Sequence, residues 1–160
     1  MTQTEAVKLF EQKKVRTVWD NEQEEWYFSV VDVVAVLTDS VNPTDYLKKL
    51  KKRDTELGLF LGTNCPQVMM MTKTGKRRKT LAADTKALFR IIQSIPSPKA
   101  EPFKLWMAQV AKERLDQLQD PELSIHQAMS DYKRLGYSDS WINQRLKSIE
   151  VRKVLTIMCL

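Results

Sequence analysis

The sequence carries four adjacent cations in the stretch KTGKRRKT, which spans residues 73–80. A fifth cation stands just ahead of them, so the full set is Lys73, Lys76, Arg77, Arg78 and Lys79. Ammonium and guanidinium groups bind phosphate oxygens, and a guanidinium donates two parallel hydrogen bonds to one anion. Like charges packed this closely repel one another unless an anion lies among them. The stretch therefore predicts contact with an acidic polymer, and a solvated surface loop is the alternative.

The positive charge of the chain is concentrated around this stretch. The formal net charge is +6, whereas residues 43–90 alone hold 12 Lys and Arg against 4 Asp and Glu, a net of +8. The other residues hold 14 against 16, a net of −2. Charge gathered on one part of a fold is the electrostatic signature of a polyanion-binding protein. We expect phosphate-led binding of a nucleic acid, with little discrimination between bases.

A second group of cations lies in a predicted helix over residues 43–53. Asn42 suits the helix cap and Pro43 the first helical position. The cations that cover much of this helix are Lys48, Lys49, Lys51, Lys52 and Arg53. A solvated helix face explains them equally well when the helix is taken alone. We expect the fold to bring this helix and residues 76–79 to one side, where together they neutralise several phosphates.

No pattern in the sequence indicates catalysis or metal binding. His126 is the single histidine, and the two cysteines, Cys65 and Cys159, lie far apart without a second ligand nearby. Four carboxylates of a kind that can hold a metal are explained as helix caps or first-turn charges, namely Asp32, Asp39, Asp45 and Asp84. We predict no enzymatic activity, no catalytic residue, no metal site and no cofactor.

Two β-hairpins are predicted to position these groups. The first joins KKVRTVWD, residues 13–20, to EWYFSV through the acidic loop NEQE. The second pairs residues 67–72 with 78–82 and places the cations at its tip, with Met69 to Met71 in the core or half-buried. Aromatic residues of the first hairpin either stack bases or pack under helices, and packing is favoured for Trp19, Trp26, Tyr27 and Phe28.

The remaining segments read as helices and connections. Ser29 and Asp32 form a capping box ahead of VVAVL, which favours a helix, with a strand as the rival because valine is β-branched. TELGLFLGTN, residues 55–64, is predicted to be a loop with two glycines. Asp84 caps the next helix, and a proline-rich turn leads into a helix over about 99–118. The core-facing stripe expected on it is Phe103, Trp106, Met107, Val110, Ala111, Leu115 and Leu118.

Strands that come as hairpins, without strand–helix–strand crossovers, predict an α+β fold: a small antiparallel sheet packed with about four helices. This domain is expected over residues 1–120, followed by a helical extension over 121–160. The extension is predicted to hold helices over 122–135 and 139–155. A plain helical hairpin is favoured over a helix-turn-helix, whose second helix would present Asn143, Gln144, Arg145 and Lys147 to a DNA groove.

The sequence shows no signal for secretion or membrane insertion. MTQTEAVKLFEQ lacks the basic and apolar regions of a secretory signal, and no apolar run approaches the roughly 20 residues that cross a bilayer. The two cysteines fit reduced thiols. We expect a cytoplasmic protein, associated with the bacterial nucleoid, that has no membrane partner.

Two stretches resemble the Bro-N domains of phage antirepressors and baculovirus repeated-ORF proteins. WYFSVVDVVAVLTDSVNP is similar to their opening, where an aromatic strand leads into a helix. DTKALFRIIQSIPSPKAEPFKLWMAQV is similar to their ending, through Leu88, Ser97, Pro98, Ala100, Phe103 and Trp106. The resemblance covers about residues 8–118. It implies a prophage-type or bacterial DNA-binding regulator of transcription, with no enzymatic activity and no cofactor.

The tail GYSDSWINQRLKSIEVRK resembles the region after Bro-N in bacterial relatives of the DNA-damage-inducible protein D group. Those relatives continue well beyond this point, so the chain is expected to be truncated at VLTIMCL. The resemblance leaves two direct targets open. One is DNA, and the other is a protein such as a repressor or a recombination factor, which an antirepressor can bind without touching DNA.

Overall fold

The computed structural model describes residues 15–158, with side chains up to residue 150. The chain divides into two compact units, Met1–Gln109 and Val110–Leu160. This division falls inside one long helix, ahead of the domain boundary expected at residue 120. The expected separation of a domain from an extension at that residue stays a prediction.

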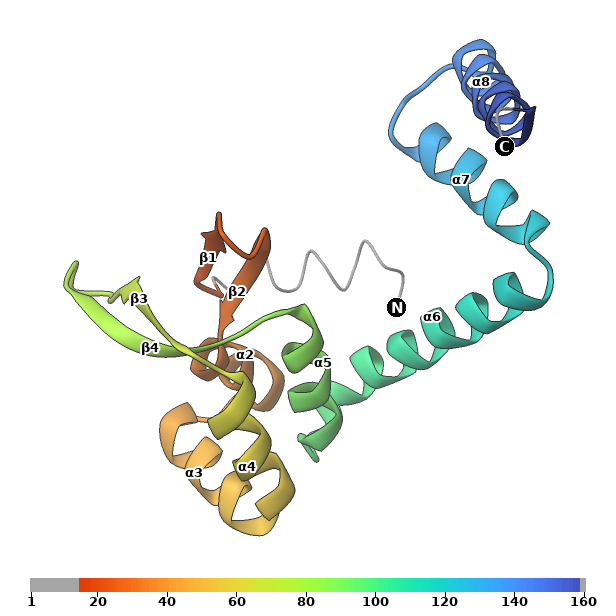
Figure 1. Cartoon of the computed structure of the whole chain (residues 1–160). Helices are drawn as coiled ribbons and strands as arrows, with labels where there is room; N and C mark the ends of the chain where they lie inside the picture. Colours follow the sequence, from red (N-terminus) through yellow and green to blue (C-terminus); the bar gives the residue numbers. More distant parts are fainter. Residues whose placement is uncertain (1–14, 159–160) are drawn as a thin grey trace. The chain divides into compact units, whose positions relative to one another are not determined.

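The first unit is built around a four-stranded antiparallel sheet (Figure 1). Its strands are β1 (Thr17–Asp20), β2 (Glu25–Ser29), β3 (Gln67–Met71) and β4 (Arg77–Ala83), in the spatial order β1-β2-β4-β3. The two hairpins meet only where β2 pairs with β4, through Phe28 with Ala83 and Ser29 with Ala82. The sheet therefore opens into two arms from a short central junction. The predicted α+β class is confirmed, while residues 13 and 14 of the first hairpin lie outside the described residues.

Side-chain caps begin the helices that follow the first hairpin. The Ser29 hydroxyl accepts a hydrogen bond from the Asp32 amide at the start of α2 (Val30–Thr38), which settles the choice between helix and strand. Asn42 caps α3 (Pro43–Arg53) through the Asp45 amide, at 3.1 Å. Each cap satisfies one of the backbone N–H groups that a helix start leaves without a partner. Both predicted caps are confirmed, but the reciprocal half of the capping box does not form: the Ser29 amide donates to the Arg16 carbonyl at 3.0 Å, and the Asp32 carboxylate accepts from Arg16.

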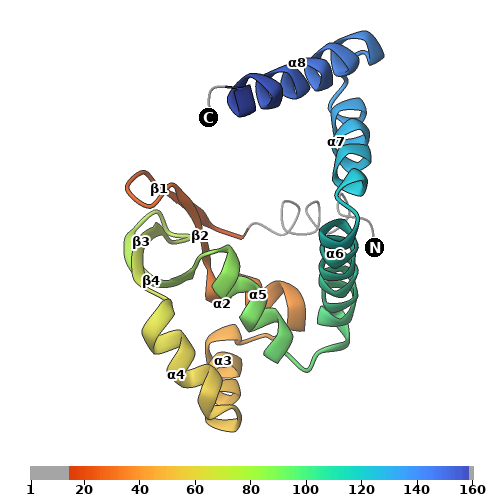
Figure 2. The same ribbon diagram turned by 45° about the vertical axis from the view of Figure 1, so that its right-hand side comes forward.

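Residues 55–64 form a helix, α4 (Thr55–Asn64), so the prediction of a loop is wrong. Asp54 caps it through the Leu57 amide at 2.9 Å, and Leu57 and Leu61 are buried one turn apart. Gly58 lies where α3 and α4 approach each other, since a Cβ there would be 3.4 Å from the Lys51 carbonyl oxygen. Figure 2 shows α3 and α4 side by side beneath the sheet. Burial of the two leucines outweighs the helix cost of the glycines.

The core of the first unit lies between the sheet and its helices. It is lined mainly by valines of α2, leucines of α3 and α4, and isoleucines of α5 (Thr85–Ser94). Asp84 caps α5 through the Ala87 amide at 2.8 Å, as predicted. Met70 is 3% exposed, whereas Met69 and Met71 are about half exposed, as expected for neighbouring strand residues that point to opposite faces.

The stripe predicted on the long helix is wrong over most of its length. A short 3-10 turn, η1 (Pro98–Ala100), leads into α6 (Glu101–Gln119), where Phe103 is buried in the core. Trp106 is only partly buried and meets the Phe89 ring edge-on at 6.1 Å. The later stripe residues, Val110, Ala111, Leu115 and Leu118, are all exposed. Only the first turns of α6 belong to the first unit, so only they share its core.

The second unit contains two further helices, α7 (Glu122–Arg134) and α8 (Asp139–Met158). Their junction is held by aromatic rings: Tyr137 stacks on Trp141 at 4.2 Å, and Tyr132 meets both edge-on. Ile142 is buried. The predicted pair of helices is confirmed, and the choice between a plain hairpin and a helix-turn-helix stays open because the four groove candidates, Asn143, Gln144, Arg145 and Lys147, are all exposed. Among the described residues, no helix has the length and apolar character needed to span a membrane.

Candidate nucleic-acid interface

The five central cations lie on the arm that β3 and β4 form, at and beside its turn. The Thr72 amide donates to the Lys76 carbonyl at 2.7 Å, and the Gly75 amide donates to the Thr72 carbonyl at 3.0 Å. Gly75 has φ +80, a left-handed conformation that costs glycine little and other residues more. A three-residue loop, residues 73–75, therefore reverses the chain. Lys73 lies in this loop, Lys76 directly follows it, and Arg77 to Lys79 begin β4.

All five of these cations are exposed, and the strand register divides them between the two faces of the arm. Arg77 stands opposite Met71 and Lys79 stands opposite Met69, so these four side chains share one face. Arg78 stands opposite Met70 and therefore points to the other face. The narrow ribbon thus presents positive charge on both of its sides, and the major groove of duplex DNA is wide enough to admit a two-stranded ribbon.

Nothing within the described residues neutralises this charge. The segment over residues 67–83 contains five cations and no Asp or Glu. No ion pair of the described residues involves any of these five side chains. An arm with unpaired cations on both faces is electrostatically complementary to a phosphate backbone.

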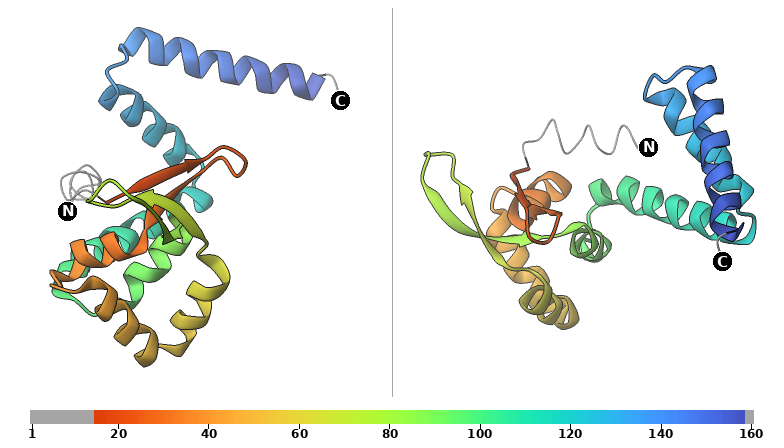
Figure 3. Two further views of the ribbon diagram at one scale, coloured as in Figure 1. Left: turned by 90° about the vertical axis from the view of Figure 1, so that its left-hand side faces the viewer. Right: turned by 45° about the horizontal axis from the view of Figure 1, so that its top comes forward.

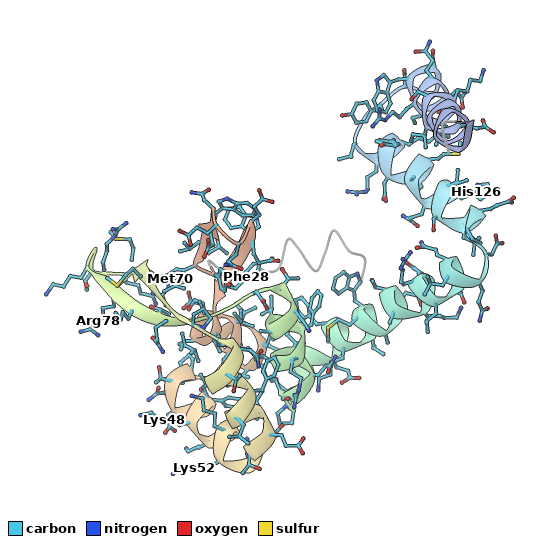
Figure 4. All side chains as sticks on the ribbon, viewed as in Figure 1. Phe28, Lys48, Lys52, Met70, Arg78 and His126 are labelled. Carbon is cyan, nitrogen blue, oxygen red and sulfur yellow. The ribbon has the colours of Figure 1, made fainter. Side chains whose placement is uncertain are left out.

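The α3 cations are less uniform than the sequence suggests. Lys48, Lys49, Lys52 and Arg53 are exposed, but Lys51 is half-buried beside α4. Lys49 pairs with Asp45 at 2.8 Å, and this contact lowers the pKa of the Asp45 carboxyl through its hydrogen bond and charge. Figure 4 shows Arg78 on the arm and Lys48 and Lys52 on α3 projecting from the same side of the first unit. The helix packs against α2 and α4, and β4 packs against α2 and α5.

Arg16 connects the basic arm to the start of α2, and sequence reasoning missed this residue. Its guanidinium contacts Asp32 through Nε at 2.7 Å and through Nη2 at 3.0 Å. Nη1 of the same group donates to the Met71 carbonyl at 3.1 Å. The hydrogen bond to Asp32 raises the pKa of Arg16 above its ordinary value. Partners 16 and 55 residues away along the chain leave no local signal from which this contact could be predicted.

The two tryptophans of the first hairpin do not pack under the helices, so that prediction is wrong for them. Trp19 and Trp26 are 42% and 49% exposed, and their rings meet edge-on at 5.2 Å. Phe28, in contrast, packs against the core, and Tyr27 is partly buried. The pair stands on an arm whose loop is acidic, and this combination is the signal that sequence reasoning could have used.

The remaining candidates for chemistry have structural partners or lie apart. Asp32 binds Arg16, Asp84 caps a helix, and Asp39 pairs with Lys99. His126 is exposed on α7. Over the part of the chain that the structure describes, no three His, Cys, Asp or Glu side chains are grouped so that they could hold a metal.

The antiparallel sheet and the helices packed on it make the first unit a small α+β domain with a basic arm. Residues 14–113 match the family described as the BRO family, N-terminal domain (Bro-N). This match covers more than half of the chain, and the chain therefore belongs to the Bro-N family. No curated protein and no solved structure matches the chain.

Proposed function

We propose that this Bro-N domain is a DNA-binding regulatory domain that contacts phosphates first through its basic arm. The observation that carries the proposal is the exposure of Lys73, Lys76, Arg77, Arg78 and Lys79 on a two-stranded ribbon with no carboxylate of its own. Such a ribbon is narrow enough to lie in or along a groove of duplex DNA. Binding through lysine and arginine gives affinity with little base discrimination.

The helix α3 supplies the second contact in this proposal. Lys48, Lys52 and Arg53 are exposed and have no ion-pair partner among the described residues. Lys49 contacts DNA only when its ion pair with Asp45 is broken. Lys51 lies beside α4 and contributes least to DNA binding. The regulatory setting is that of a prophage antirepressor-like protein, as the resemblance to phage antirepressors implies.

The salt dependence of binding to an arbitrary fluorescent duplex tests this proposal. The basic arm alone, with about five phosphate contacts, predicts a slope of roughly −4.5 for log affinity against log salt, and contacts from α3 steepen it. Affinity then falls about 500-fold between about 50 and about 200 mM KCl. A slope near zero, together with a partner retained from cell extract, supports instead a module that binds a repressor or recombination protein without touching DNA.

A further inference from the structure

The two arms of the sheet carry opposite charge. We call residues 17–29 the acidic arm, because they hold four carboxylates and no Lys or Arg. We call residues 67–83 the basic arm, because they hold five cations and no Asp or Glu. The proposed DNA contact uses the basic arm alone and gives the acidic arm no role.

The acidic arm combines an exposed aromatic pair with free carboxylates. Trp19 and Trp26 stand opposite each other in the register, and both rings are more than 40% exposed. Glu22 and Glu24 lie in the adjoining loop and have no side-chain partner among the described residues. In contrast, Asp20 is engaged, since it accepts hydrogen bonds from two amides of its own loop at 2.8 and 3.0 Å.

This chemistry selects a cationic ligand. Four carboxylates repel phosphates, so the tryptophans are not a base-stacking platform for DNA. Tryptophan faces attract guanidinium and ammonium groups, and nearby carboxylates strengthen that attraction. Exposed tryptophan pairs are also typical of interaction surfaces, where large aromatic side chains become buried.

The basic arm fits this ligand class, but it cannot reach the acidic arm of its own chain. Strands β2 and β4 run antiparallel through their shared pairs, so the two turns lie at opposite ends of the sheet. Both views in Figure 3 show the two tips pointing to opposite sides. No ion pair joins the arms among the described residues. Contact between them therefore requires two copies.

We propose that the acidic arm of one copy binds the basic arm of a second copy. One face of the basic arm presents Arg77 and Lys79 beside Met69 and Met71, and all four are exposed. Cations suit the tryptophan faces and the free glutamates, and methionine sulfur makes favourable contacts with aromatic rings. The basic arm of a second copy thus matches the acidic arm in charge and in apolar character. DNA and the second copy then compete for the basic arm.

Sedimentation velocity of the full chain without DNA tests this pairing, using charge reversals on each arm. Glu22→Lys with Glu24→Lys changes the acidic arm from four carboxylates to two carboxylates and two lysines, a net charge of zero. Arg77→Glu with Lys79→Glu changes the basic arm from five cations to three cations and two carboxylates, a net charge of +1. Each variant alone should self-associate at least about ten-fold more weakly than the parent at low salt, because one arm has lost most of its net charge and its substituted side chains repel the opposing arm. An equimolar mixture of the two should regain association, because the unchanged acidic arm of the Arg77→Glu, Lys79→Glu variant can bind the unchanged basic arm of the Glu22→Lys, Glu24→Lys variant.

Three results would overturn the proposal: a parent chain that stays monomeric at low salt, association that survives both variants, or a mixture that remains monomeric. Unchanged circular dichroism melts establish that each variant is folded. The Glu22→Lys, Glu24→Lys variant keeps the whole basic arm, so it should bind duplex DNA at least as tightly as the parent. Its DNA affinity therefore separates failure of this inference from failure of the proposed function.

Discussion

The guanidinium of Arg16 donates two hydrogen bonds to the carboxylate of Asp32, from Nε at 2.7 Å and from Nη2 at 3.0 Å. The same group donates to the Ser29 hydroxyl at 3.2 Å and to the Met71 carbonyl at 3.1 Å. One side chain thus ties the start of α2 to the last residue of β3, just before the turn of the basic arm.

Replacing Asp32 by Asn should therefore destabilise the domain by about 1–3 kcal/mol, because the partly buried guanidinium loses its charged partner. Asp45→Asn is the matched control, since Asp45 also lies in the first turn of a helix but pairs with an exposed lysine. Exposed pairs contribute little, so its melting temperature should stay near that of the parent. Urea unfolding followed by circular dichroism measures both. Equal losses would show that helix charge, and not the Arg16 contact, matters at Asp32.

Phe103 should be a larger contributor to stability than Trp106. Phe103 is 2% exposed in the core, whereas Trp106 is only partly buried against Phe89. Phe103→Ala should cost about 3–5 kcal/mol, as large truncations in cores do, and Trp106→Ala should cost less. The sequence, in contrast, predicts that both residues are buried. The account of α6 is wrong if the tryptophan variant unfolds at the lower urea concentration.

Replacing Gly75 and Gly62 by alanine should change the free energy of unfolding in opposite directions. Gly75 has φ +80, so Gly75→Ala forces a left-handed alanine and should destabilise by about 1 kcal/mol. Gly62 lies in α4 with nothing within 4 Å of a new Cβ, so Gly62→Ala should stabilise by about 0.5–1 kcal/mol. Urea midpoints measured side by side give the two signs. If Gly62→Ala destabilised the protein, the assignment of residues 55–64 as a stable helix would be contradicted.

The Cys65 thiol should be almost inert in the folded protein. Burial raises the pKa of this thiol to about 11. In a Cys159→Ser background, iodoacetamide at about pH 8 should label it roughly 100-fold more slowly than in urea, because only the thiolate reacts. Folding stability should also fall as pH rises from about 9 toward 11, because the unfolded thiol ionises first. Native and unfolded labelling rates within a few-fold of each other would contradict the buried position.

Local signals in the sequence predicted local structure well. Ser29, Asn42 and Asp84 each cap the helix they were expected to cap, because a cap depends on residues two or three positions away. The failure at residues 55–64 has the opposite cause. The two glycines indicated a loop, whereas packing against α3 and burial of Leu57 and Leu61 stabilise a helix.

In the candidate site, too, the features set by neighbouring residues were predicted and those set by distant contacts were not. The exposure of the basic arm follows from its turn and its charge, both readable from residues 72–80. The position of Arg16 depends on contacts between distant segments, which no pattern within a window of residues encodes. The exposed tryptophans are a different case, because the acidic loop beside them was a local signal that they do not lie under the helices. Similarly, an apolar stripe such as Leu115 and Leu118 shows which side chains share a helix face but not whether anything covers that face.

The central claim is that the basic arm is the main phosphate contact, and a double substitution tests it most directly. Arg77→Ala with Arg78→Ala removes one cation from each face of the arm and should leave the melting temperature nearly unchanged. The control is Lys112→Ala with Arg114→Ala, which removes the same charge from exposed positions on α6.

The measurement is the slope of log affinity against log salt for an arbitrary duplex. The arginine variant should bind about ten-fold or more weakly at moderate salt, with a slope shallower by about two. The control variant should keep a slope close to that of the parent. If both variants lose the same affinity and the same slope, the charge acts diffusely and the arm has no special role, which would contradict the account.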